Sequence, residues 1–522
     1  GSTMQVHDLL LDSALREPGR RFVNHAGTWY TYGEVARMAR TLAGFLRKDA
    51  GLSQGGRVAV LWENGIESVV SFFGVLIAGG VAVPLNGELR GESLSYLIEH
   101  SEAEALIVSR KLITRLPEQV FERGGLRAVI SDAKRNGVFP WTDVLRDGDG
   151  GSAVGSAAAR TIDIDRAAII YTSGSTGVPK GVVLSHLNLV SNMRSIVEYL
   201  HLTGEDSIMV ILPLFYIYGL SLLLTHAMVG GAVVFDNRFM YPNTVLEHMV
   251  ESRVSGFAGV PSTFSVLLSR SSVREMAFPD LRYVTQAGGA MPVAVQKEAA
   301  AAFAPAELYV MYGATEAAPR LSYVEPAELS RKWGSIGKAV PNVELYVADE
   351  DGHRLPPGTE GELVARGSNI TCGYWKDPGG TAAVLRNGLY YTGDLGTEDE
   401  EGFLYVTGRS KDIMKIKGYR VSPREIEEIL AQIDDVAEAS VIGVPDDVLG
   451  EAPVAYVVKN GNQSLSADEL KRHLGRHLAT YKVPTEIHFT DALPKSGAGK
   501  VLKTVLREQH AGGSGETGSR PQ

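Results

Sequence analysis

One segment of the chain combines the side chains and the backbone freedom that a phosphate-binding loop needs. Residues 171 to 181 have the sequence Tyr-Thr-Ser-Gly-Ser-Thr-Gly-Val-Pro-Lys-Gly. Glycines let backbone N–H groups approach an anion, hydroxyls donate hydrogen bonds, and Lys180 adds positive charge. Apolar runs at 167–170 and 182–184 predict a strand on each side. Composition alone fits a flexible surface loop equally well, but the flanking strands favour phosphate binding.

Two well-known phosphate-binding motifs are excluded by the sequence. Lys180 is followed by Gly181 instead of Ser or Thr, which rules out a Walker A loop. The chain has no H-R-D or D-F-G element, which rules out a protein kinase.

Further segments place polar residues beside glycines or after predicted strands. The turn Gly288-Gly289-Ala290 follows an apolar run at 281–287, where a ligand can lie against bare backbone. The others are Tyr-Gly-Ala-Thr-Glu at 312–316, Thr-Gly-Asp at 392–394, and a glycine-rich loop that ends at Lys500. Taken singly, a Glu, Asp or Lys in such a segment is usually a solvated surface charge.

These segments, and Gly-Arg-Ser-Lys-Asp at 408–412, resemble the motifs of the adenylate-forming superfamily. They follow one another along the chain in the same order as those motifs. That superfamily contains acyl-CoA synthetases, adenylation domains of peptide synthetases, and luciferases. The resemblance spans about residues 8 to 508 and is closest to carboxylic acid–CoA ligases.

The resemblance implies a role for each matching residue. Catalysis would depend on Lys500, Thr315, Glu316 and Lys180, with Glu316 also holding Mg²⁺. Tyr312 would pack on adenine, and Asp394 would accept hydrogen bonds from both ribose hydroxyls. The full set of implied nucleotide-binding residues is Thr172, Ser173, Gly174, Ser175, Thr176, Gly177, Gly288, Gly289, Ala290, Tyr312, Gly313, Asp394 and Arg409.

Other matching positions imply a moving domain and an acid pocket. Lys411 would be the hinge, and Lys415 and Gly418 would belong to a loop used in the second half-reaction. The predicted walls of the acid pocket are Tyr216, Ile217, Leu220 and Met311, joined by Gly288 and Gly289. Tyr216 stands where relatives that activate amino acids carry an aspartate. Because an unpaired ammonium in a dry pocket would cost several kcal/mol, a plain carboxylic acid is the expected substrate.

The predicted function is an AMP-forming carboxylic acid ligase that uses ATP, Mg²⁺ and coenzyme A. Loading of the acid onto the phosphopantetheine of an acyl-carrier protein is the close alternative, because both acceptors present the same thiol arm. An amino-acid adenylation domain and a luciferase-like oxygenase are further alternatives within the superfamily. From a different class, a nucleotide-binding sensor without catalysis is disfavoured by the complete set of motif residues.

The elements that must position these residues are predicted from periodicity and capping. Thr31 and Glu34 have capping-box spacing before an amphipathic helix. A strand at 57–62, a helix at 66–78 and a strand at 81–85 give a β-α-β rhythm, which implies a parallel sheet covered by helices. Asn387-Gly388 is a hairpin signal, and helices are predicted to start after Ser422 and Ser466.

The predicted fold class is α/β. A large N-terminal domain of stacked α/β sheets plus a small β-barrel is followed by a smaller, mobile α+β C-terminal domain. The predicted bounds are 4–408 for the large ATP- and acid-binding domain, 409–510 for the small lid domain, and 511–522 for a disordered tail.

Composition narrows the partners and the location. A chain of 522 residues is too long for one core, which agrees with several domains. A net charge of −10 gives no general affinity for nucleic acid, and a single cysteine allows no disulfide framework. The longest apolar run, 69–85, is broken by glycines and is not predicted to span a membrane. The protein is therefore predicted to be cytoplasmic.

Overall fold

The computed structural model describes residues 4–146, 160–172 and 178–513 of the chain. Five predicted residues of the phosphate loop lie outside the described residues: Ser173, Gly174, Ser175, Thr176 and Gly177. The predicted disordered tail starts slightly too early, because the last helix includes residues 511 to 513. The remainder of that tail, 514–522, also lies outside the described residues.

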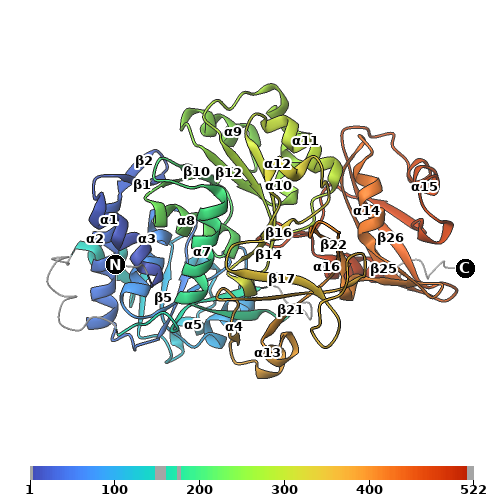
Figure 1. Cartoon of the computed structure of the whole chain (residues 1–522). Helices are drawn as coiled ribbons and strands as arrows, with labels where there is room; N and C mark the ends of the chain where they lie inside the picture. Colours follow the sequence, from blue (N-terminus) through green and yellow to red (C-terminus); the bar gives the residue numbers. More distant parts are fainter. Residues whose placement is uncertain (1–3, 147–159, 173–177, 514–522) are drawn as a thin grey trace, which may run out of the picture.

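Two mainly parallel sheets form the body of the large domain (Figure 1). The nine-stranded sheet has the order β16 (Lys338–Ala339), β15 (Arg320–Tyr323), β14 (Glu307–Gly313), β13 (Tyr283–Gln286), β12 (Gly256–Gly259), β10 (Ser207–Val210), β11 (Ala232–Phe235), β1 (Arg21–His25) and β2 (Thr28–Thr31). The eight-stranded sheet has the order β19 (Gly373–Tyr374), β9 (Lys180–Ser185), β8 (Arg166–Thr172), β4 (Val81–Pro84), β3 (Arg57–Leu61), β5 (Ala103–Val108), β6 (Ala128–Ser131) and β7 (Phe139–Pro140). The predicted parallel α/β arrangement is confirmed, with β3 paired in parallel to both β4 and β5.

One large apolar core holds the two sheets together. It contains buried residues of both sheets and of the helices between them, which are α1 (Val6–Arg16), α2 (Tyr32–Lys48), α3 (Ile66–Ile77), α6 (Trp141–Arg146), α7 (His186–Leu200) and α8 (Ile217–Val229). A second core covers the outer face of the nine-stranded sheet with α9 (Pro242–Glu251), α10 (Pro261–Arg270), η2 (Val273–Glu275), α11 (Val293–Phe303) and α12 (Pro326–Leu329). A third covers the other sheet with α4 (Glu92–His100), η1 (Ile113–Arg115) and α5 (Gln119–Glu122).

Local sequence signals explain where the helices begin. Thr31 Oγ1 accepts the Glu34 N–H at 3.2 Å, and Glu34 Oε2 accepts the Thr31 N–H at 2.8 Å. This is the predicted capping box, and it opens α2. Ser185 caps α7 in the same way by accepting the Asn188 N–H at 3.0 Å. The helix after the phosphate loop is therefore set by residues close to it in the chain.

An antiparallel sheet of five strands completes the large domain where a small barrel was predicted. Its strands are β17 (Val343–Ala348), β18 (Gly361–Gly367), β20 (Leu385–Arg386), β21 (Leu389–Glu398) and β22 (Leu404–Arg409), with α13 (Pro378–Val384) beside it. Within the described residues, the strand pairs leave this sheet open. Asn387 and Gly388 both have positive φ, 54° and 74°, and form the predicted hairpin turn before β21.

The small C-terminal domain has its own sheet and core. The strands are β23 (Met414–Ile416), β24 (Tyr419–Val421), β25 (Val436–Asp446), β26 (Gly450–Lys459) and β27 (Glu486–Phe489). The helices are η4 (Ser410–Asp412), α14 (Pro423–Ala431), α15 (Ala467–Gly475), η5 (Thr480–Lys482) and α16 (Lys503–Gly513). Figure 1 shows this domain, in orange and red, at one end of the molecule. Among the described residues no helix is long and apolar enough to cross a bilayer.

Candidate active site

The ends of the predicted phosphate loop are fixed by the β8–β9 hairpin. Thr172 and Lys180 are cross-strand partners, so the chain leaves and re-enters the sheet at one place. The Lys180 ammonium forms an ion pair with Asp377 and lies 5.3 Å from the centre of the Tyr374 ring. The hydrogen bond from Lys180 lowers the pKa of Asp377. Asp377 was not predicted, because it is an ordinary helix cap in the sequence and accepts the Gly380 N–H at 2.8 Å.

Glu316 lies in η3 (Thr315–Ala317) and is held by two phenols. Its Oε2 accepts hydrogen bonds from Tyr374 Oη at 2.9 Å and from Tyr390 Oη at 3.0 Å. Burial, and then the charge of Glu316, raise the pKa of both tyrosines, so each phenol stays protonated and remains a donor. Since Tyr374 also faces Lys180, the phosphate-loop lysine and the predicted metal-binding glutamate belong to one cluster. No local pattern identified either tyrosine.

The predicted adenosine-binding residues come together beside this cluster. Tyr312 Oη donates to Asp394 Oδ2 at 2.5 Å, and Arg409 Nε lies 3.5 Å from Asp394 Oδ1. The register of β21 and β22 pairs Asp394 with Arg409. Thr315 is buried. A Cβ at Gly313 would lie 2.1 Å from the Pro319 carbonyl oxygen, so this position admits only glycine.

The predicted acid pocket lies at the start of α8 and the end of β14. Tyr216 precedes α8, and the other predicted walls, Ile217, Leu220 and Met311, are buried. Gly288 has a φ of 88°, and a Cβ there would lie 2.5 Å from Tyr216 Oη. The following residues, Gly289 and Ala290, are exposed. The turn at 288–290 therefore touches the pocket through Gly288.

Lys500 comes from the small domain and lies against this pocket. Its Nζ is 5.8 Å from the centre of the Tyr216 ring. The neighbouring Gly499 accepts a hydrogen bond from Ser262 Oγ at 3.2 Å. Val260 adjoins both Gly288 and Gly499, at 3.0 and 2.8 Å from their hypothetical Cβ atoms. The structure thus holds the small domain in a position that presents Lys500 to the predicted acid pocket.

The predicted hinge and thiolation loop lie elsewhere in the small domain. Lys411 is in η4, directly after β22, where Asp412 accepts a hydrogen bond from Arg507 at 3.1 Å. Lys415 is on β23, and its N–H donates to Glu451 Oε2 at 2.6 Å. Gly418, with a φ of 82°, forms the turn to β24. These hydrogen bonds stay inside the small domain, so the structure does not join Lys415 and Gly418 to the Lys500 group.

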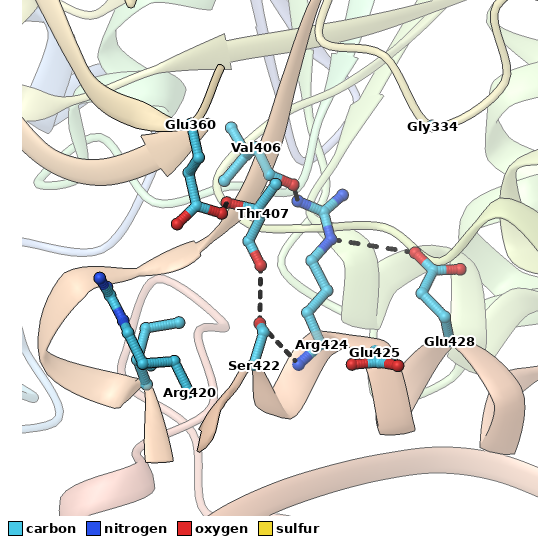
Figure 2. A pocket seen from close by; sticks show the side chains of 10 residues that line it. Gly334, Glu360, Val406, Thr407, Arg420, Ser422, Arg424, Glu425 and Glu428 are labelled. Carbon is cyan, nitrogen blue, oxygen red and sulfur yellow. Dashed lines mark hydrogen bonds and ion pairs between the residues drawn. The ribbon is translucent and has the colours of Figure 1, made fainter. Parts of the chain in front are cut away.

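A separate cavity of about 440 Å³ marks the junction of the two domains (Figure 2). It lies between β22 and the start of α14, where Arg424 Nη1 donates to the Val406 carbonyl at 2.6 Å and Ser422 Oγ donates to the Thr407 carbonyl at 2.6 Å. Glu428 Oε1 is 3.9 Å from Arg424 Nε. Of the predicted nucleotide and acid residues that the structure describes, none lines this cavity. It belongs to the domain junction.

The fold joins a large α/β domain to a smaller C-terminal domain, whose Lys500 lies against Tyr216 of the large one. Comparison with known proteins identifies the family to which such an enzyme belongs. The profile of the family described as AMP-binding enzyme matches residues 10–375, and that of the AMP-binding enzyme C-terminal domain matches residues 425–500. The chain belongs to this family.

The similar proteins act on acids of different kinds. An indoleacetate–CoA ligase of Aromatoleum aromaticum is 31% identical over 97% of this chain and 98% of its own. A long-chain-fatty-acid–CoA ligase of Yersinia pestis is 32% identical over 96% of this chain and 94% of its own. The solved structure of the anthranilate CoA ligase AuaEII with anthranoyl-AMP superimposes with a TM-score of 0.89 and 26% identity, covering 97% of both chains.

Proposed function

We propose that this protein is an AMP-forming acid–CoA ligase that activates a carboxylic acid with ATP and transfers the acyl group to a thiol. Membership of the AMP-binding enzyme family, with CoA ligases as relatives along nearly the whole chain, supports this activity. The single observation that carries the assignment of residues is the placement of Lys500, 5.8 Å from the Tyr216 ring. A lysine from one domain thereby reaches the acid pocket of the other.

In the first half-reaction, an oxygen of the acid attacks the α-phosphorus of ATP and pyrophosphate leaves. Lys500 would bridge the α-phosphate and the carboxylate, and so offset the negative charge on both. Asp394 would hold the ribose hydroxyls, and Tyr312 would pack on adenine. Lys180, now paired with Asp377, would exchange this partner for the leaving pyrophosphate.

Glu316 fits the proposed Mg²⁺ site. Magnesium bound to nucleotides usually takes one or two protein carboxylates and completes its shell with phosphate oxygens and water. Glu316 supplies one carboxylate, and Tyr374 and Tyr390 fix its orientation from one side. When bound, the ion would neutralise phosphate charge as the α–β bond breaks.

In the second half-reaction, the thiolate attacks the acyl carbonyl of the adenylate and AMP leaves. Lys500 must then withdraw, because it occupies the space over Tyr216. We propose rotation about Lys411, which would carry the Lys415–Gly418 loop toward the site. The acceptor is proposed to be coenzyme A, with carrier-protein phosphopantetheine as the alternative.

Replacement of the tail lysine tests this division of labour. Lys500→Ala should abolish acid-dependent ATP–pyrophosphate exchange, yet spare thioester formation from a supplied acyl-adenylate. Lys495→Ala is a matched control in the same segment, because Lys495 Nζ bonds Glu438 at 2.9 Å inside the small domain. Equal loss of both half-reactions in Lys500→Ala would refute the assignment.

Two measurements separate the remaining alternatives. Competition between coenzyme A and carrier proteins in the thioester assay identifies the acceptor. A nucleotide sensor without catalysis would give no exchange with any acid. The cytoplasmic location predicted from the sequence stays a prediction.

A further inference from the structure

Arg320 is a buried cation that has no matching anion in the described part of the chain. It is 2% exposed and is the largest fully buried side chain in the part of the chain that the structure describes. Its Nε and Nη1 atoms have no hydrogen-bond partner among those residues. The guanidinium contacts the Tyr218 ring, whose centre is 5.1 Å from Arg320 Cζ. A cation–π contact of this kind offsets only part of the cost of burying a charge.

Hydrogen bonds to its backbone fix the position of Arg320 in the sheet. Its N–H donates to Asn192 Oδ1 at 2.7 Å, and its carbonyl accepts from Asn192 Nδ2 at 2.9 Å and from Asn369 Nδ2 at 3.1 Å. It is also the cross-strand partner of Gly313, in the predicted nucleotide motif. The main chain of Arg320 is therefore held beside the predicted nucleotide motif, and its guanidinium is buried at the Tyr218 ring.

Within the described part of the chain, no surrounding side chain bonds Nε or Nη1 of the guanidinium. It faces a small cavity of about 10 Å³, room for one water molecule. The hydroxyls of Tyr218 and Thr285 bond each other at 2.7 Å, and Ser221 Oγ donates to the Tyr218 carbonyl at 2.5 Å. His226 Nε2 lies 2.7 Å from Tyr283 Oη. No carboxylate of the described chain lines the cavity. These polar groups thus bond one another, and none of them bonds Nε or Nη1 of Arg320.

This cavity adjoins the proposed acid pocket. Met311 lines the cavity and is also a predicted wall of the acid pocket. Tyr218, whose ring faces the guanidinium, meets the Tyr216 ring edge-on at 6.3 Å. Lys500 contacts Tyr216, and Arg320 contacts Tyr218. The two cations therefore lie at opposite ends of this pair of rings. The flexible thioether of Met311 can move to join the two spaces.

We infer that Arg320 receives a second carboxylate of the substrate, so that the preferred acids are dicarboxylic. One carboxylate would react beside Lys500, and the other would pair with the guanidinium at the far end of the pocket. A carboxylate is favoured over a neutral acceptor because it cancels the buried charge and matches the planar donors of arginine. This inference rests on the proposed ligase function and names its substrate class.

The test is ATP–pyrophosphate exchange over straight-chain dicarboxylic acids and the monocarboxylic acids of equal chain length. The wild-type enzyme should have a kcat/KM at least about tenfold higher for the best dicarboxylic acid than for its monocarboxylic partner, as expected for a charged hydrogen bond. Arg320→Met should reverse this preference, because the buried cation is replaced by an apolar chain of similar length. Arg282→Met is the control, since Arg282 pairs with Asp206 at 3.0 Å. The Arg282→Met variant should prefer the same acids as the wild-type enzyme.

The outcomes are distinguishable. The inference is overturned if the wild-type enzyme prefers the monocarboxylic acids or uses both series equally well. That result does not depend on whether Arg320→Met folds, and it leaves the proposed ligase function unaffected. A folded Arg320→Met variant that loses activity equally on both series also overturns it, because Arg320 would then be only structural. Absence of exchange with every acid overturns the proposed function together with the inference.

Discussion

Two phenols determine the orientation of the Glu316 carboxylate. Tyr374 and Tyr390 both donate to the same oxygen, Oε2, and so leave Oε1 for another ligand. Both phenols have raised pKa values because they are buried. They act on the proposed metal site through Glu316, so we regard them as positioning residues.

Removing either hydroxyl should weaken the proposed metal site without destroying it. Tyr374→Phe and Tyr390→Phe should each raise the Mg²⁺ concentration needed for half-maximal exchange by about tenfold or more, since one hydrogen bond to a charged group contributes about 1.5–3 kcal/mol. The change should be seen equally in direct titration of Mg²⁺ and ATP binding by calorimetry. Tyr391→Phe is the matched control, because the Tyr391 hydroxyl is buried without a hydrogen-bond partner among the described residues. An unchanged Mg²⁺ dependence in both variants would contradict the positioning role.

At the scale of elements, the turn after β13 brings its backbone against the wall of the acid pocket. Gly288 has a φ of 88°, which L side chains rarely adopt, and it lies directly below Tyr216 Oη. The end of one strand therefore fixes the position of the aromatic residue that opens α8. A side chain at this turn would displace Tyr216 or strain the turn.

Gly288→Ala should impair acid binding far more than Gly289→Ala. The added methyl at 288 would lie 2.5 Å from Tyr216 Oη, whereas the one at 289 would lie 3.4 Å from Pro261 Cγ. The left-handed backbone alone would cost an alanine at position 288 about 1–2 kcal/mol. The kcat/KM for the acid should therefore fall about tenfold or more in Gly288→Ala. Steady-state kinetics measure kcat/KM for both variants, and thermal unfolding shows whether each variant keeps its stability. Similar losses in the two alanine variants would show that the close approach to Tyr216 does not matter.

At the scale of the whole molecule, two contacts between the domains hold the small domain, the proposed lid, where Lys500 meets Tyr216. Glu428 Oε2 on α14 accepts the Val293 N–H at the start of α11 at 3.0 Å. Ser262 Oγ donates to the Gly499 carbonyl at 3.2 Å. Because these bonds span both domains, they stabilise this lid position relative to any other.

Glu428→Ala should shift the lid away from this position. Loss of one hydrogen bond of about 1 kcal/mol should slow adenylate formation about fivefold, while thioester formation from supplied acyl-adenylate should be unchanged or faster. Separate assays of pyrophosphate release and thioester yield measure the two steps. Glu425→Ala is the control, because Glu425 bonds Lys482 at 2.8 Å within the small domain. Equal slowing of both half-reactions by Glu428→Ala would argue against a role in lid position.

The sequence by itself determined the features that depend on neighbours along the chain. The capping box at Thr31, the Asn387-Gly388 hairpin and the β-α-β rhythm are local, and each was found in the structure. The motif segments could likewise be found as strings of residues. Their order alone identified the family, since the chemistry of a nucleotide site requires particular residue types at fixed spacing.

Tertiary structure alone decided which side chains meet. Tyr374 and Tyr390 follow Glu316 by 58 and 74 positions, and Asp377 follows Lys180 by 197. Arg320 looks like an ordinary surface arginine until its burial and its missing partner are known. Periodicity and capping depend on residues only a few positions apart in the sequence. Burial and the pairing of side chains depend instead on which strands lie side by side. For that reason the sequence could suggest candidate reacting groups, whereas it could not suggest the side chains that pack against them.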